Sequence, residues 1–397
     1  MKQDGKLNRV METKTSSKNG GSSKSLMSRI VTIIGIAMVS SCGTIGQYSY
    51  TSAQTYSLPV KTTEVITPLI IEGTNVPGTS LAEKLAWLQR SAESHNTYIV
   101  EVNTNENIAP HTLEYKGAVN ITVVLRGDSI NRTIRLKSNG TMFTILPNVT
   151  FILDNNITLQ GHSGNTDVMV SVKGGIFKMN DGATIVGNDG GGVHVVYEPA
   201  YGNRMGTFEM HGGTISSNNT AYSGGGVNVG YRQKFIMSGG VISGNTADYG
   251  GGVAGGLTMT GGTISGNTAK KTGGGVSVNS GCSFEMTGGT ISGNTANRGG
   301  GVNSDNKFTM RGGIITSNTA LEYGGGVYGG ITKTGGTITG YGSDTTNGNV
   351  VNDGAGILTR RGHAVCYIFS MANTMYRKEN TVGQRENLSD RSENWDK

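Results

Sequence analysis

Residues 235–253 read FIMSGGVISGNTADYGGGV, and close copies of this stretch recur along the second half of the 397-residue chain. Its Gly-Gly-x-Ile marker occurs six times, with the first glycine at positions 212, 239, 261, 288, 312 and 335. Successive markers are therefore 27, 22, 27, 24 and 23 residues apart. A repeat period of about 20–50 residues is typical of solenoids, propellers and other arrays of stacked units.

Each repeat has the same internal order of residue types. An aromatic or aliphatic residue and a methionine precede most markers, an asparagine follows at a constant offset, and three glycines and a valine end the unit. The apolar residues lie two apart in three short segments, which predicts three short strands in each unit. We therefore expect an all-β, parallel β-helix in which one unit forms one three-strand coil of 22–27 residues. A propeller is the alternative, although its blades need about 40 or more residues.

In such a coil each strand pairs with its own copy in the next coil, about 4.8 Å away. Phe208, Met210, Ile215, Val227 and Val229 are then expected to point inward and to stack on the equivalent side chains of neighbouring coils. We expect the glycines at corners, where positive φ is needed, and the asparagines in a side-chain ladder. One coil buries too little apolar surface to fold alone, so the array needs neighbours and capped ends.

The segment before the repeats predicts one helix followed only by strands. Ser80 and Glu83 have the spacing of an N-terminal capping box. The apolar residues that share one face of this helix are Leu81, Leu85, Leu88 and Ala92. We expect a capping helix in residues 80–97 and the β-helix in residues 98–357, with a small separate N-terminal domain as the alternative. Residues 358–397, where the repeat decays, are expected to form a degenerate cap or a disordered tail.

The N-terminal segment has the features of an export signal. Residues 1–29 carry a net charge of +5, and ten apolar or nearly apolar residues follow them. This run is too short to cross a bilayer, which needs about 20 residues. It fits the core of a signal peptide.

A motif at the end of this run resembles the bacterial lipobox, in which an apolar residue and two small residues precede a cysteine. The motif is Val39-Ser40-Ser41-Cys42. The resemblance implies a lipoprotein signal peptide in residues 1–41, a lipid on the sulfur of Cys42 and a tether in residues 42–79. A thiolate is a good nucleophile for acquiring a lipid. A plain cleaved signal with an incidental cysteine is the alternative.

Charge and cysteine content argue against several functions. Outside residues 1–29 only about +1 of the total net charge of +6 remains, so nucleic-acid binding is not expected. Cys282 and Cys366 are far apart and have no C-x-x-C spacing, which predicts neither a disulfide framework nor a zinc site. His194 and His211 have no partners at ligand spacing. We therefore expect no metal and no other cofactor.

The Gly-Gly-x-Ile, Ser-Gly-Asn-Thr-Ala and Gly-Gly-Gly-Val units resemble the repeats of bacterial right-handed parallel β-helix surface proteins. They are similar to polymorphic outer-membrane proteins and autotransporter passengers, which have a pectin-lyase-like architecture. The resemblance covers roughly residues 98–357 and implies a right-handed coil, but it implies little about activity because a fold does not fix function. Autotransporters end in a large β-barrel, whereas about 40 residues follow Ile357 here. A lipid on Cys42 would replace that barrel as the membrane anchor.

An enzyme of this architecture would need carboxylates on one outer face, and glycoside cleavage needs two of them about 5 to 9.5 Å apart. Glu209 and Glu285 share an outward slot, but Ile236 and Thr258 hold that slot in the two repeats between them. These carboxylates are therefore expected to be too far apart to cooperate. We predict no catalytic residues and a non-catalytic protein, with a polysaccharide lyase or glycoside hydrolase as the alternative.

One column at the edge of the repeats is a candidate binding strip. Tyr249 and Tyr323 precede the glycine triplets of their repeats, and Tyr222 lies one position earlier in its own repeat. Tyrosine provides contact area at low entropic cost, whereas turn residues that shield the corner backbone are the alternative. The sequence as a whole predicts a monomeric, exported lipoprotein, lipid-anchored in the bacterial outer membrane and surface-exposed. It would use its β-solenoid for adhesion to a glycan or to a host or matrix protein.

Overall fold

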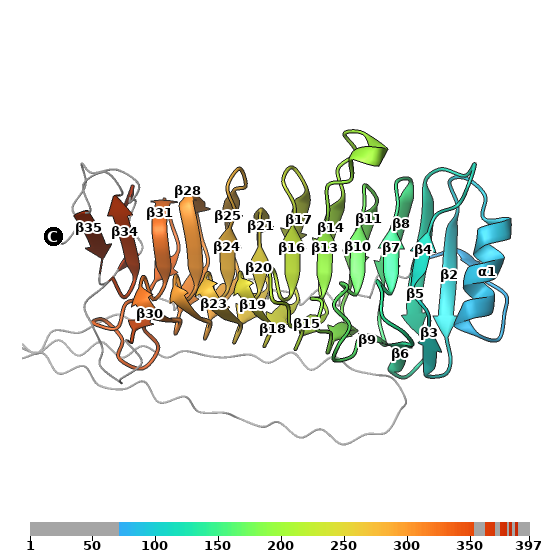
Figure 1. Cartoon of the computed structure of the whole chain (residues 1–397), viewed down its shortest axis with the longest axis horizontal. Helices are drawn as coiled ribbons and strands as arrows, with labels where there is room; N and C mark the ends of the chain where they lie inside the picture. The colour runs from blue at the N-terminus through green and yellow to red at the C-terminus, as the bar shows by residue number, and fades with distance from the viewer. Residues whose placement is uncertain (1–70, 353–361, 370–373, 379–380, 383–385, 388–397) are drawn as a thin grey trace, which may run out of the picture. The chain divides into compact units, whose positions relative to one another are not determined.

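A computed structural model describes residues 71–352, 362–369, 374–378, 381–382 and 386–387 of the chain. They form a right-handed parallel β-solenoid of about 10 coils with one α-helix at its N-terminal end (Figure 1). The strands belong to three sheets of 21, 11 and 5 strands, which we name sheets A, B and C. The predicted all-β parallel fold is confirmed. Cys42 and the predicted signal peptide lie outside the described residues.

The strands follow one another around the coils, so sheets A and B contain strands from the whole length of the stack, whereas sheet C begins at Thr246 in β19. Sheet A consists of β1 (Thr74–Asn75), β2 (Thr97–Val102), β4 (His111–Leu113), β5 (Ile121–Gly127), β7 (Phe143–Ile145), β8 (Val149–Leu153), β10 (Val170–Val172), β11 (Ile176–Met179), β13 (Val193–Val195), β14 (Thr207–Met210), β16 (Val227–Val229), β17 (Lys234–Met237), β20 (Val253–Ala254), β21 (Leu257–Met259), β24 (Val276–Val278), β25 (Phe284–Met286), β28 (Val302–Met310), β31 (Val327–Lys333), β34 (Val365–Phe369), β35 (Thr374–Lys378) and β37 (Glu386–Asn387). Sheet B consists of β3 (Glu106–Ile108), β6 (Arg132–Leu136), β9 (Ile157–Gln160), β12 (Ala183–Val186), β15 (Thr214–Ser216), β18 (Val241–Ser243), β22 (Thr263–Ser265), β26 (Thr290–Ser292), β29 (Ile314–Thr316), β32 (Thr337–Ile338) and β36 (Thr381–Val382). Sheet C consists of β19 (Thr246–Tyr249), β23 (Thr268–Thr272), β27 (Thr295–Arg298), β30 (Thr319–Tyr323) and β33 (Val350–Val351).

One coil runs from β16 through β17 and β18 to β19. Its strands β16 and β17 lie in sheet A, β18 lies in sheet B and β19 lies in sheet C. The coil therefore has three faces, as predicted, but two short strands separated by a loop build the sheet A face. In β28 and β31 a single longer strand of nine or seven residues spans this face instead.

Equivalent residues of successive repeats lie directly beside one another. Ile215 pairs with Ile242, and Phe208 pairs with Phe235 in the same coil-to-coil register. Their side chains belong to one continuous core that follows the axis of the stack. The five side chains predicted to point inward are almost completely buried; they are Phe208, Met210, Ile215, Val227 and Val229. The predicted stacking of equivalent residues is confirmed.

Aromatic rings form one column of this core. The first four rings stack with neighbouring centroids 4.7 to 5.8 Å apart; they are Phe151, Phe177, Phe208 and Phe235. The ring of Phe143, on β7, lies 4.9 Å from that of Phe151 but is tilted by 43°. Leu257, which pairs with Phe284, interrupts the column. The rings of Phe284 and Phe308 then stack at 4.5 Å. Ile331 takes the equivalent position in β31.

The predicted asparagine ladder lies at the corner between sheets B and C. Six buried side chains form it; they are Asn218, Asn245, Asn267, Asn294, Asn318 and Asn349. The Nδ2 of each of the first five donates to the Oδ1 of the next asparagine, with N···O distances of 2.8 to 3.1 Å. Each Nδ2 also donates to a backbone carbonyl, as Asn267 does to Ile242 at 2.9 Å. The ladder therefore joins side chains and backbone of neighbouring coils.

The glycine triplets meet two structural demands, and the repeat pattern predicts only the first. Gly250, the first glycine of its triplet, has a φ of 62° and turns the corner as predicted. Gly252, the third glycine, has no φ in the left-handed region. A Cβ atom at Gly252 would lie 2.6 Å from the carbonyl oxygen of Gly275 in the next coil. Close approach of two backbones, rather than positive φ, therefore requires glycine at this position.

The helix α1 (Leu81–Ser91) packs on β2 and β3 at the N-terminal end. The predicted capping box is present, because the N–H of Glu83 donates to Ser80 Oγ and the Glu83 carboxylate accepts from the N–H of Ser80. The apolar face is buried in the solenoid core; its members are Leu81, Leu85 and Leu88.

This helix is shorter than the predicted segment 80–97. It ends at Ser91 because Ala92 takes an extended conformation. The N–H of Glu93 then donates to the hydroxyl of Tyr98, at 2.8 Å, and so leaves the helical hydrogen-bond pattern. The chain enters β2 six residues after the end of the helix.

Short strands follow the last repeat. β34 pairs with β31 in parallel, through Val365 with Val327 and Cys366 with Tyr328. The strands beyond β34 are antiparallel to their partners: β35 pairs with β34, β36 with β32 and β37 with β31. The parallel pairing of sheets A and B therefore ends in antiparallel strands.

Candidate binding surface

The tyrosine column predicted from the repeats lies on the outer edge of sheet C. Successive members pair with one another in the order Ser223, Tyr249, Thr272, Arg298 and Tyr323. Tyr222 lies beside this column, where its carbonyl oxygen accepts the N–H of Tyr249 at 3.1 Å. Tyr249 and Tyr323 are three ladder steps apart, or about 14 Å at the usual strand spacing. The tyrosines are therefore in one row but are not adjacent.

Two cations occupy the space beside the tyrosine rings. Tyr222 is 79% exposed and Tyr249 is 38% exposed. Lys271 Nζ lies 4.7 Å from the ring centroid of Tyr249, and Arg298 Cζ lies 5.7 Å from that of Tyr323. Cations within about 6 Å of a ring centroid are attracted to the aromatic face. We name the set of Tyr222, Tyr249, Lys271, Arg298 and Tyr323 the tyrosine edge.

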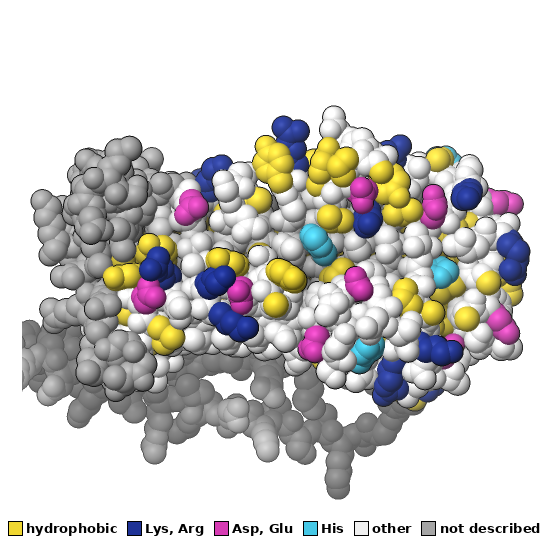
Figure 2. Space-filling model, viewed as in Figure 1, with side chains coloured by type: hydrophobic (Ala, Val, Ile, Leu, Met, Phe, Trp, Pro, Cys, Tyr) yellow, Lys and Arg dark blue, Asp and Glu magenta, His cyan; other side chains and the backbone are white. Residues whose placement is uncertain are grey.

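Carboxylates hold both cations in place. Lys271 Nζ lies 3.1 Å from the Asp248 carboxylate, and Arg298 Nε donates to Glu322 at 2.7 Å. The hydrogen bond to Glu322 raises the pKa of Arg298, and hydrogen bonds to Asp248 and Tyr249 raise the pKa of Lys271. Both groups therefore keep their charge at neutral pH. Figure 2 shows hydrophobic, basic and acidic side chains side by side along this edge.

The repeat pattern did not reveal the two cations as partners of the tyrosines. Lys271 lies where the register of β19 and β23 shifts, so it has no equivalent in the neighbouring repeats. The sequence contains one signal of this added residue. In the repeat that contains Lys271, the interval from the ladder asparagine to the glycine triplet is six residues, whereas it is five in the repeats on either side. Arg298 also lies 5.8 Å from the ring of Tyr328, which comes from sheet A. Such a contact across a corner depends on the folded coil.

The two acidic residues that share an outward slot are held apart by the ladder. Glu209 and Glu285 are three strands apart in register, or about 14 Å, beyond the separation that glycoside cleavage needs. Glu209 forms ion pairs with Lys178 at 2.9 Å and His211 at 3.4 Å, and Glu285 pairs with Arg311. Burial raises the pKa of Glu209, but hydrogen bonds and charges from Lys178 and His211 hold that pKa below its usual range. These carboxylates do not form a cooperating pair.

No group of three or more His, Cys, Asp and Glu side chains in the described part of the chain is placed to hold a metal ion. No helix within those same residues has the length and apolar character needed to cross a membrane. Fold and surface together define a parallel β-solenoid with a mixed aromatic and cationic outer edge. Comparison of the chain with protein-family models, curated proteins and solved structures gives no match.

Proposed function

We propose that this chain is an exported, lipid-anchored adhesion protein of a bacterial outer membrane, and that its solenoid binds a partner outside the cell without catalysis. The observation that supports a binding role is the tyrosine edge, where exposed rings and fixed cations lie in one row. Because sheet C fixes the backbone of Tyr249 and Tyr323, and ion pairs with Asp248 and Glu322 restrain Lys271 and Arg298, the cost of ordering these groups on binding is reduced. The protein acts as a monomer in this proposal.

The chemistry of the tyrosine edge suits a partner with polar and apolar faces. Tyr222 and Tyr249 present amphipathic rings, which stack on sugar faces or on apolar side chains. Lys271 and Arg298 add donors for carboxylate, sulfate or carbonyl oxygens. A glycan or a matrix protein meets both requirements.

Replacing Tyr222, Tyr249 and Tyr323 with serine is expected to weaken binding to a glycan and matrix-protein array by about tenfold, since buried aromatic contacts dominate many interfaces. The matched control replaces three exposed apolar side chains elsewhere with serine; they are Val119, Ile130 and Ile314. The control should bind like the unmodified chain. Equal binding by the tyrosine variant would contradict the role of the tyrosine edge.

The anchor is tested separately. If Cys42 carries the lipid, cells that express the Cys42→Ala chain should incorporate no labelled palmitate into it, and the chain should leave the membrane fraction. Cys282→Ala is the matched control, because this thiol is buried in the solenoid and should leave labelling unchanged. Labelling of the Cys42→Ala chain would rule out this anchor.

The same purified chain tests the absence of catalysis that we propose. Incubation with a panel of polysaccharides should release neither reducing ends nor unsaturated sugars. Release of either product would instead support a polysaccharide lyase or a glycoside hydrolase.

A further inference from the structure

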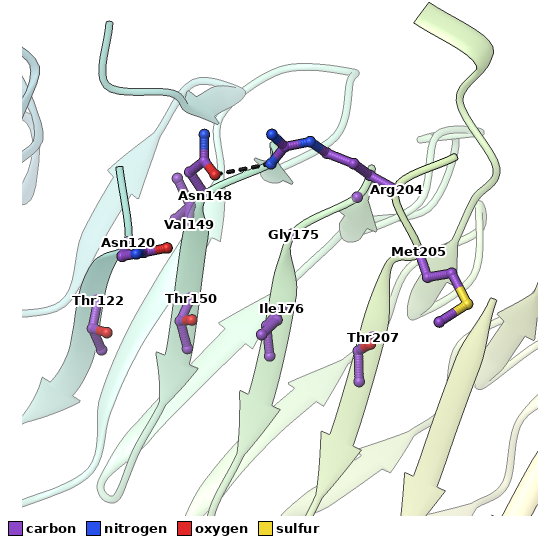
Figure 3. Close-up of a pocket in the computed structure, with 11 residues that line it drawn as sticks. Asn120, Thr122, Asn148, Val149, Thr150, Gly175, Ile176, Arg204, Met205 and Thr207 are labelled. Carbon is purple, nitrogen blue, oxygen red and sulfur yellow. Dashed lines mark hydrogen bonds between the residues drawn. The ribbon is translucent and has the colours of Figure 1, made fainter. Parts of the chain in front are cut away.

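A groove crosses the strand beginnings of four successive coils of sheet A, away from the tyrosine edge. Its volume is about 380 Å³, within the range of ligand pockets. The outward side chains of neighbouring strands form its floor in register; they are Thr122, Thr150, Ile176 and Thr207. Figure 3 shows these side chains in one row. The floor thus carries a threonine hydroxyl in three of its four coils and the apolar side chain of Ile176 in the other.

Two asparagine side chains form the upper wall of the groove, and a glycine without a side chain takes the same position in the next coil. Asn120 and Asn148, at equivalent positions before their strands, have φ values of 56° and 67°. Gly174 takes the equivalent position in the next coil, where a Cβ atom would lie 3.1 Å from Pro147 and 3.3 Å from Arg204. The missing side chain lets Arg204 pass over this coil toward Asn148.

Arg204 is the only charged residue among the eleven that line the groove. It comes from the loop that contains the short 3-10 helix η1 (Pro199–Tyr201), and its Nη1 donates to Asn148 Oδ1 at 2.9 Å (Figure 3). A guanidinium has five N–H donors, so this bond leaves others for a ligand. Lys234, which is exposed on β17, pairs with Thr207 in the next coil. It therefore adds a second positive charge at that end of the groove.

An apolar rim borders the groove on the side of this loop. Met205, which lines the groove, is 58% exposed, and Tyr231 in the next loop is 57% exposed. The two loops are joined, because Gln233 accepts the N–H of Gly206 at 2.7 Å. Arg232 lies with its guanidinium carbon 5.2 Å from the Tyr231 ring. Figure 2 shows hydrophobic side chains gathered along this upper edge, with basic side chains beside them.

We propose that this groove binds a linear acidic polysaccharide. Arg204 would bind a carboxylate or sulfate of one sugar with two parallel hydrogen bonds, while the threonine hydroxyls and asparagine amides bind sugar hydroxyls. The rim supplies apolar surface for the faces of sugar rings. The elongated floor, with equivalent groups about 4.8 Å apart, suits a chain of repeating units rather than a compact ligand. This site does not depend on the tyrosine edge.

The test is calorimetric titration of the full chain with three probes: alginate, which carries carboxylates, dextran sulfate, and uncharged dextran. We expect one or both acidic polymers to bind and dextran to bind at least about tenfold more weakly. Preference between alginate and dextran sulfate identifies the anion. The proposal would be overturned if dextran bound as tightly as the acidic polymers, or if neither acidic polymer bound.

Variants locate the site. Arg204→Gln is expected to reduce affinity for the acidic polymer by about tenfold or more and to weaken the salt dependence of binding. Thr150→Val, which removes a floor hydroxyl at nearly constant volume, should reduce affinity several-fold. The matched control is Arg135→Gln, since Arg135 is an exposed arginine on sheet B; it should bind like the unmodified chain. Unchanged affinity in both groove variants would overturn the proposal, whereas the three-tyrosine variant should bind the acidic polymer normally.

Discussion

The Asn267→Ala chain is expected to unfold at a markedly lower urea concentration, with a loss of stability on the order of 4 kcal/mol. Asn267 lies in the middle of the ladder and is completely buried. Its Oδ1 accepts both the backbone N–H and the Nδ2 of Asn245, each at 3.0 Å. Its Nδ2 donates to Ile242 and to Asn294. Alanine would leave several buried polar groups without partners, and each such group costs about 1–3 kcal/mol.

Asn228→Ala is the matched control for this prediction. Asn228 is half-buried at an outward position of β16, between the inward residues Val227 and Val229. Its removal should shift the urea midpoint only slightly, as is usual for surface substitutions. Similar midpoints for Asn267→Ala and Asn228→Ala would show that the ladder contributes little to stability.

The Phe208→Ala chain is expected to lose about 3–5 kcal/mol of stability, the usual cost of removing a buried phenylalanine. The ring of Phe208 stacks between Phe177 at 4.9 Å and Phe235 at 4.7 Å, so the substitution also removes two ring contacts. A cavity would remain in the middle of the column, because the coils above and below are fixed by their own ladders. Denaturant unfolding followed by circular dichroism measures the loss.

Phe208→Leu is the informative comparison, since the chain itself has Leu257 at one position of this column. Leucine fills most of the space but offers no ring for stacking, so we expect a loss of about 1–2 kcal/mol. If alanine and leucine at this position destabilised the chain equally, ring stacking rather than cavity formation would be the main source of stability. If neither destabilised the chain, the stacked column would not be a significant part of its core energy.

The repeats predict the register of the solenoid because every copy of a residue has the same neighbours. Ile242 and Asn245 keep a constant offset from their marker, so stacking one coil on the next aligns them. The capping box at Ser80 is predictable for a different reason, since it depends on residues only three positions apart. Local spacing and long-range periodicity thus account for most of the fold.

The candidate sites were only partly predictable from the sequence. The column containing Tyr249 and Tyr323 follows from the repeat, but Lys271 is an added residue in one strand and Tyr328 comes from another sheet. Arg204 lies in a loop outside the repeat pattern, and its approach to Asn148 joins residues 56 positions apart. Contacts of this kind depend on loop conformation, which periodicity does not specify.

The different structures at the two ends of the solenoid also define its length. At the N-terminal end α1 packs on β2 and β3, and at the other end the antiparallel strands β35, β36 and β37 pair with the last parallel strands. About 10 coils at the usual strand spacing give a rod of roughly 50 Å. The length of the solenoid is therefore set by the number of its coils. Inserting or deleting one repeat would change its reach by about 4.8 Å.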